Sequence, residues 1–174
     1  PLDVQAGDVE ADDVLESTET LVDSAEVVEP LGYIHPLSPK EAEDLNEEPT
    51  VIRIELEASP KMHETPDGAV AGYAYNDQTP GPTIRGTVGD TLEVQLTNNL
   101  MVPTTIHWHG AHVPWEMDGV TWKQDAVTPG ETFVYSFPLT RPGTFWYHPH
   151  FDTDSQVDLG LYSVLIVEDP AEPK

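Results

Sequence analysis

The sequence predicts an all-β domain, folded as an antiparallel sandwich or barrel and preceded by an acidic, largely irregular N-terminal extension. From residue 50 onward the chain contains seven or eight short runs typical of strands, and several of them alternate apolar and polar residues, which is the pattern of strands with one buried face. Turns rich in proline and glycine separate these runs, and the domain is nearly free of helical periodicity. Roughly 125 residues suit one such domain.

The expected strands follow one another at short intervals. They cover residues 51–57, 68–75, 83–85, 91–97, 104–109, 131–139, 143–150 and 161–167. Three of them place their apolar side chains on one face: Ile52, Ile54 and Leu56; Leu92, Val94 and Leu96; Phe133, Tyr135 and Phe137. Turn-forming residues lie between the runs, as N-D at 76–77, T-P-G-P at 79–82, V-G-D at 88–90, T-P-G at 128–130 and R-P-G at 141–143. Residues 111–124 are expected to form a long loop, and the very apolar run 161–167 belongs in a sheet interior.

Charge divides the chain near residue 49. Residues 1–48 hold 15 of the 32 acidic residues and a single base, Lys40. Repulsion between carboxylates disfavours independent folding of such a segment, although residues 41–48 are a candidate for one short helix after Ser38-Pro39. We therefore predict an acidic extension at 1–49, a β domain at 50–170, and the start of a linker or C-terminal tail at 171–174.

Composition excludes several classes of function. The formal net charge of -25 disfavours binding to nucleic acid or to anionic lipid. No apolar run approaches the roughly 20 residues of a membrane-spanning helix. The absence of cysteine excludes disulfides, thiolate zinc sites, iron–sulfur clusters and a cysteine-ligated blue copper centre in this chain. No signal peptide is visible, but the chain begins at Pro1 rather than methionine, so the loss of an export signal stays open.

Two His-x-His motifs are the strongest functional signal. His107 and His109 lie in T-T-I-H-W-H-G, and His148 and His150 lie in G-T-F-W-Y-H-P-H. Alternate side chains of a strand share a face, so each motif can direct two imidazoles the same way while the residue between them faces elsewhere. If the two strands are close together, four imidazoles converge, and this arrangement predicts a metal site.

Coordination chemistry alone leaves the metal open. Imidazole suits zinc, copper, iron and nickel, and four imidazoles could hold a zinc ion tetrahedrally. A cupin site would need a glutamate shortly after the first motif, and Glu116, seven residues beyond His109, fits that pattern poorly. Copper is the remaining alternative, and the residues around the motifs favour it.

The chain from residue 79 to 170 resembles the first cupredoxin domain of the multicopper oxidases, the family of laccases and bilirubin oxidases. The matching pieces follow the order and spacing of that family and cover roughly half of the chain: T-P-G-P-T-I-R-G-T-V-G-D at 79–90, T-T-I-H-W-H-G at 104–110, M-D-G-V at 117–120, T-P-G-E-T-F-V-Y-S-F at 128–137, G-T-F-W-Y-H-P-H at 143–150 and G-L-Y-S-V-L-I-V-E-D-P at 160–170. The acidic segment 1–48 has no counterpart there.

The resemblance implies a Greek-key β-sandwich and a role in a trinuclear copper cluster that reduces O2 to water. Eight histidines hold that cluster in the family, four of them in the first domain. By this pattern His107 would bind the type 2 copper, His109 and His148 one ion of the type 3 pair, and His150 the other ion. Asp118, in M-D-G, would correspond to an acidic residue that relays protons in some relatives; its alternative role is that of a turn residue beside Gly119.

The other half of the family pattern is missing from this chain. The remaining four histidines and the cysteine of the type 1 copper are absent. The chain is then a part of a longer oxidase, one subunit of a split oxidase completed by a partner chain, or a free-standing domain that binds copper for storage, delivery or structure. The expected partners are accordingly further cupredoxin domains, a partner subunit or a second copy across the histidine face, with O2 as acceptor in an assembled oxidase. The resemblance also implies export to the periplasm or the outside of the cell.

Overall fold

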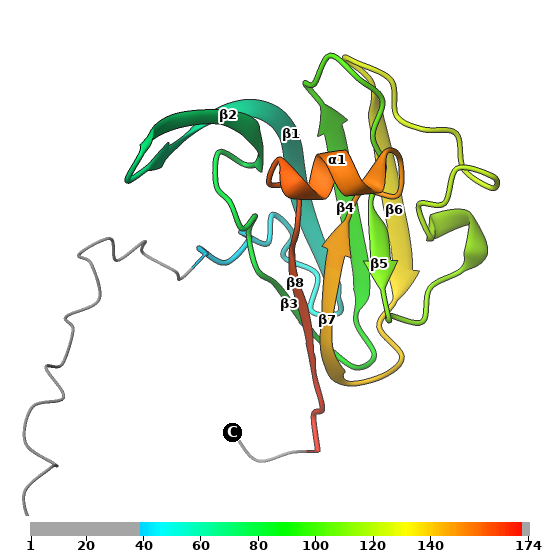
Figure 1. Cartoon of the computed structure of the whole chain (residues 1–174). Helices are drawn as coiled ribbons and strands as arrows, with labels where there is room; N and C mark the ends of the chain where they lie inside the picture. Colours follow the sequence, from blue (N-terminus) through cyan, green and yellow to red (C-terminus); the bar gives the residue numbers. More distant parts are fainter. Residues whose placement is uncertain (1–38, 172–174) are drawn as a thin grey trace, which may run out of the picture. The chain divides into compact units, whose positions relative to one another are not determined.

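Two four-stranded sheets form the domain in the computed structural model of the chain, which describes residues 39–171 (Figure 1). Most of the predicted extension (1–38) and of the predicted tail (172–174) lies outside the described residues. The elements, in order, are β1 (Val51–Thr65), β2 (Gly68–Tyr75), β3 (Ile84–Thr87), β4 (Thr91–Asn98), β5 (His107–His109), the 3-10 turn η1 (Trp115–Met117), β6 (Thr132–Pro138), β7 (Gly143–His148), α1 (Thr153–Asp158) and β8 (Ser163–Glu168).

The predicted β-sandwich is confirmed, with one change in its topology. One sheet has the order β2-β1-β4-β6 and the other β3-β8-β7-β5. Both are mixed rather than purely antiparallel, because β1 pairs with β4, and β3 with β8, in parallel. The chain passes from the β1–β2 hairpin through β3 in the opposite sheet before β4 returns beside β1, and such a crossover is what a parallel pair requires.

The predicted second histidine strand is too long. Strand β7 ends at His148, so His150 lies beyond the sheet. Pro149 explains the end of the strand, since proline has no N–H to donate to a ladder. The predicted helix at 41–48 is wrong, since these residues contain no helix. Residues 153–158, for which no element had been predicted, form the short helix α1.

A single apolar core lies between the sheets. Trp108 of β5 is completely buried, with its ring centroid 5.0 Å from that of Phe137 and 5.7 Å from those of Tyr135 and Tyr147. Because neighbouring residues of a strand face opposite sides, this inward Trp108 turns His107 and His109 to the outer face of the sheet. Packing of the core therefore sets the direction of the first histidine pair.

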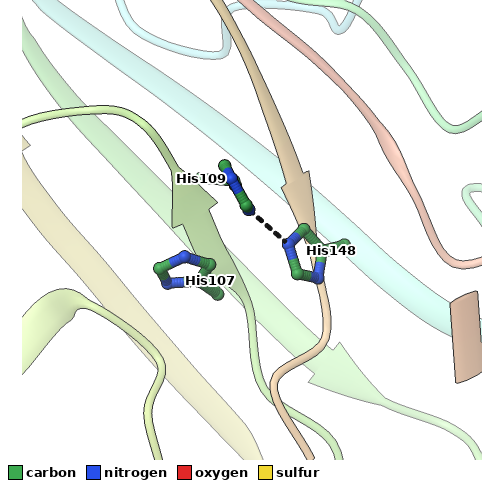
Figure 2. Close-up of side chains that lie close together, drawn as sticks. All are labelled: His107, His109 and His148. Atoms are coloured by element: carbon green, nitrogen blue, oxygen red, sulfur yellow. Dashed lines mark hydrogen bonds between the residues drawn. The ribbon is translucent and has the colours of Figure 1, made fainter. Parts of the chain in front are cut away.

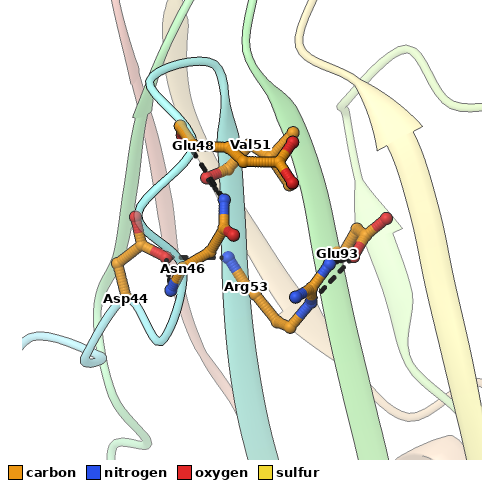
Figure 3. Close-up of polar contacts among 6 residues, drawn as sticks. All are labelled: Asp44, Asn46, Glu48, Val51, Arg53 and Glu93. Atoms are coloured by element: carbon orange, nitrogen blue, oxygen red, sulfur yellow. Dashed lines mark hydrogen bonds and ion pairs between the residues drawn. The ribbon is translucent and has the colours of Figure 1, made fainter.

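Residues 40–46 are hydrogen-bonded to both sheets. The Ala42 N–H donates to the Thr83 carbonyl (2.8 Å), and the Leu45 N–H donates to the Arg53 carbonyl of β1 (2.8 Å). Figure 3 shows the second attachment, where Asp44 Oδ1 accepts from the Arg53 N–H (2.9 Å) and the Arg53 guanidinium pairs with Glu93 (2.8 Å). The boundary between residues 49 and 50 stays a prediction.

Within residues 39–171 no helix is long and apolar enough to cross a membrane.

Candidate metal centre

The centre forms where β5 and β7 lie side by side. The two strands are antiparallel, with His107 opposite His148 and His109 opposite Trp146. Directly opposed residues project from the same face of a sheet, so the three imidazoles gather there (Figure 2). One ring nitrogen from each of His107, His109 and His148 lies within 4.8 Å of the others. The structure thus brings together three of the four predicted ligands.

His109 and His148 form a close pair in this group. His109 Nδ1 and His148 Nε2 are 3.3 Å apart. Two nitrogens bound to one ion at about 2.0–2.1 Å with a tetrahedral angle lie about 3.3–3.4 Å apart. The separation therefore matches the spacing expected of two nitrogens bound to a single ion.

His148 is held as a neutral imidazole. Its Nδ1 lies 2.9 Å from the Pro149 carbonyl and donates its proton there, which leaves the lone pair on Nε2. Burial lowers the pKa of His148 to about 4, against the opposing effect of that hydrogen bond. The imidazole is consequently uncharged at pH 7 and free to coordinate a cation.

His107 is oriented by Asp118. Its Nδ1 donates to the Asp118 carbonyl (2.8 Å) and lies 3.2 Å from the carboxylate Oδ1. This contact directs Nε2 toward the centre, as the outer hydrogen bonds of metal-binding histidines do. The Asp118 side chain is 32% exposed, so its carboxylate also reaches water.

The loop that delivers Asp118 depends on Gly119. The glycine has φ +72°. A Cβ there would overlap the backbone carbonyl of Ile106 and lie 2.8 Å from the backbone nitrogen of His107. Only glycine permits the loop to approach the start of β5 so closely. The M-D-G sequence signalled a turn here, but the close contact with His107 comes from the tertiary structure alone.

The backbone around the histidines is held by buried polar groups. The Ile106 N–H donates to the Tyr135 hydroxyl (2.8 Å), and the Thr104 hydroxyl donates to Gln156 of α1 (2.7 Å). The sequence gives no signal for this role of Gln156, because a helix of six residues is too short to show a helical period.

His150 occupies a different position from the other three. Its backbone N–H donates to Thr105 Oγ1 (2.9 Å), and its ring centroid lies 5.3 Å from that of His107. Its ring nitrogens are not in the group of three. The structure therefore sets His150 beside the centre and apart from the close pair.

Residues 58–172 match the family model described as multicopper oxidase. The chain is 44% identical over 104 residues to multicopper oxidase MmcO of Mycobacterium tuberculosis. The matched region covers 60% of this chain and 20% of that protein. It is 45% identical over 112 residues to an L-ascorbate oxidase of Nicotiana tabacum, covering 62% of this chain and 19% of that protein. The chain thus spans about a fifth of the length of these curated relatives.

A solved structure agrees with this match. The crystal structure of a multi-copper oxidase from Pseudomonas thermotolerans is 44% identical to the chain and superposes with a TM-score of 0.68. The superposition covers 71% of this chain and 30% of that one.

Proposed function

Because the chain belongs to the multicopper oxidase family, we propose that its cupredoxin domain supplies His107, His109, His148 and His150 to a copper cluster completed by other domains. The observation that supports this most directly is the convergence of three imidazole nitrogens within 4.8 Å. The donor set fits copper, since imidazole is a good ligand for it and no carboxylate competes within that group. Bound copper would supply one-electron transfer and the reduction of O2 to water.

The ligands divide between ions according to their spacing. His109 and His148 share one type 3 ion, a division favoured by their nitrogen separation of 3.3 Å. His107 serves the type 2 ion through Nε2, since its Nδ1 is occupied by Asp118. His150 binds the second type 3 ion, in keeping with its position outside the group of three.

Asp118 has the task of a proton relay in this proposal. Its carboxylate is partly exposed and lies 3.2 Å from His107 Nδ1. It can therefore take a proton from water and hold it beside the centre, where a reaction that consumes protons needs a supply.

The proposal requires ligands that this chain does not contain. The chain has no cysteine for a type 1 copper, and it spans about a fifth of its curated relatives. We assign the missing ligands to further cupredoxin domains of a longer protein or to a partner subunit, working outside the cytoplasm. Zinc can occupy the same imidazoles when copper is withheld.

Copper titration of the chain tests the ligand assignment. We expect saturable Cu²⁺ binding with nitrogen hyperfine structure in the EPR spectrum, lost in the double variant His107→Ala, His148→Ala. The matched control is His112→Ala, because His112 is exposed and lies outside the group. An unchanged copper stoichiometry in the double variant would refute the assignment.

The same titration separates the oxidase component from a free-standing copper-binding protein. A component of an oxidase should form no coupled type 3 pair until the completing domains are added. Tight saturation of the chain alone with one or two Cu²⁺, unaffected by those domains, would favour storage or delivery instead.

A further inference from the structure

Trp146 contacts both members of the close histidine pair. It lies opposite His109 in the β5–β7 register and two residues before His148 on β7, so all three side chains project from one face. The indole stacks on the His148 ring with a centroid distance of 3.8 Å and an interplanar angle of 25°. It also lies 5.0 Å from the His109 ring, at 33°.

The three candidate ligands of the group differ in how their rings are held. His107 and His148 each donate Nδ1–H to a backbone carbonyl. The His109 ring has no hydrogen bond within residues 39–171 apart from its 3.3 Å contact with His148. Rotation about χ2 of a histidine is soft, so hydrogen bonds or packing must define the direction of its nitrogens. For His109 the indole of Trp146 is the group in a position to do so.

The location of Trp146 also separates it from the aromatic core. Trp108 and Tyr147, its neighbours in the two strands, are completely buried between the sheets, whereas Trp146 is 37% exposed on the outer face. A tryptophan in that position adds little to the core, and its rigid flat surface rests on the imidazoles instead.

From these contacts we infer that Trp146 is a positioning residue for the metal centre: its indole fixes the rings of His109 and His148 so that Nδ1 of one and Nε2 of the other face a common point. The inference rests on the proposed function, because the common point is a metal ion. Trp146 would thus orient the His109 ring, as the backbone carbonyl of Asp118 orients the His107 ring.

Substitutions of Trp146 test this in the full chain, with Cu²⁺ as the probe. Trp146→Leu keeps an apolar side chain but removes the flat surface, and we expect Cu²⁺ affinity to fall by about 3- to 10-fold, the range for loss of an aromatic contact. The EPR spectrum should broaden as the ligand geometry becomes heterogeneous. Trp146→Phe should restore affinity to within about 3-fold and recover the narrow spectrum. Trp122→Leu, at an 80% exposed tryptophan, is the matched control and should change neither.

Measurements on the metal-free chain keep this inference separate from the proposed function. In the wild type we expect NOEs from the indole to both imidazoles and one set of ring signals for each histidine. In Trp146→Phe we expect the corresponding NOEs from the phenyl ring, again with one set of ring signals for each histidine. Averaged His109 ring signals are expected with Trp146→Leu. If the wild type binds no Cu²⁺, the proposed function fails while these signals still judge the orientation of the rings. Equal Cu²⁺ affinity and an equal spectrum for wild type and Trp146→Leu, or ring signals unchanged by that substitution, would overturn the inference.

Discussion

Replacing Gly119 by alanine would test whether close packing of the loop orients His107. An alanine at φ +72° costs about 1–2 kcal/mol in left-handed strain. Its Cβ would also overlap the Ile106 carbonyl, a backbone atom that no side-chain rotation can move aside. The loop must shift, and the 2.8 Å hydrogen bond from His107 to Asp118, worth about 0.5–1.5 kcal/mol, is lost with it. The free energy of unfolding should therefore fall by about 1.5–3.5 kcal/mol.

Gly130 offers a matched control for this experiment. It has a similar φ of +83°, but an added Cβ would meet no atom within 4 Å. Gly130→Ala therefore isolates the cost of left-handed strain, about 1–2 kcal/mol. Urea unfolding of both variants should show the larger loss for Gly119→Ala. Cu²⁺ affinity should fall about 10- to 100-fold in that variant alone, as expected when a ligand loses its outer hydrogen bond. Equal stability and equal affinity in the two variants would refute the reasoning.

Two further predictions concern Tyr135, whose buried hydroxyl accepts hydrogen bonds from the Ile106 N–H and the Gln124 amide. Tyr135→Phe leaves both buried donors unpaired and should lower the free energy of unfolding by about 2–4 kcal/mol. The urea midpoint should fall accordingly, and an unchanged midpoint would contradict this prediction. Burial also raises the pKa of Tyr135 to about 12, so above pH 10 the unfolded chain loses a proton that the folded chain keeps. The free energy of unfolding should fall as pH rises from about 10 to 12, and it should fall less steeply in Tyr135→Phe. Equal slopes of urea midpoint against pH in the two proteins would count against a raised pKa of Tyr135.

Much of the fold could be predicted because its signals are local. The turn residues Asn76-Asp77 after 68–75 and the alternation along 91–97 indicated strands that β2 and β4 match closely. The first strand was predicted to end at residue 57, yet β1 continues to Thr65. Its second half carries polar and exposed residues, and pairing with β2 extends the strand there. The helix α1 has only six residues, too few for a helical period to stand out.

The sequence by itself determined the candidate donors and the shared face of the first pair. The period of a strand is two residues, so His107 and His109 point the same way wherever that strand is placed. Which imidazoles meet was decided by the tertiary structure. The register sets His107 opposite His148, and the loop brings Asp118 to His107. Those contacts join residues far apart in the chain and depend on packing across the core, which no local pattern encodes.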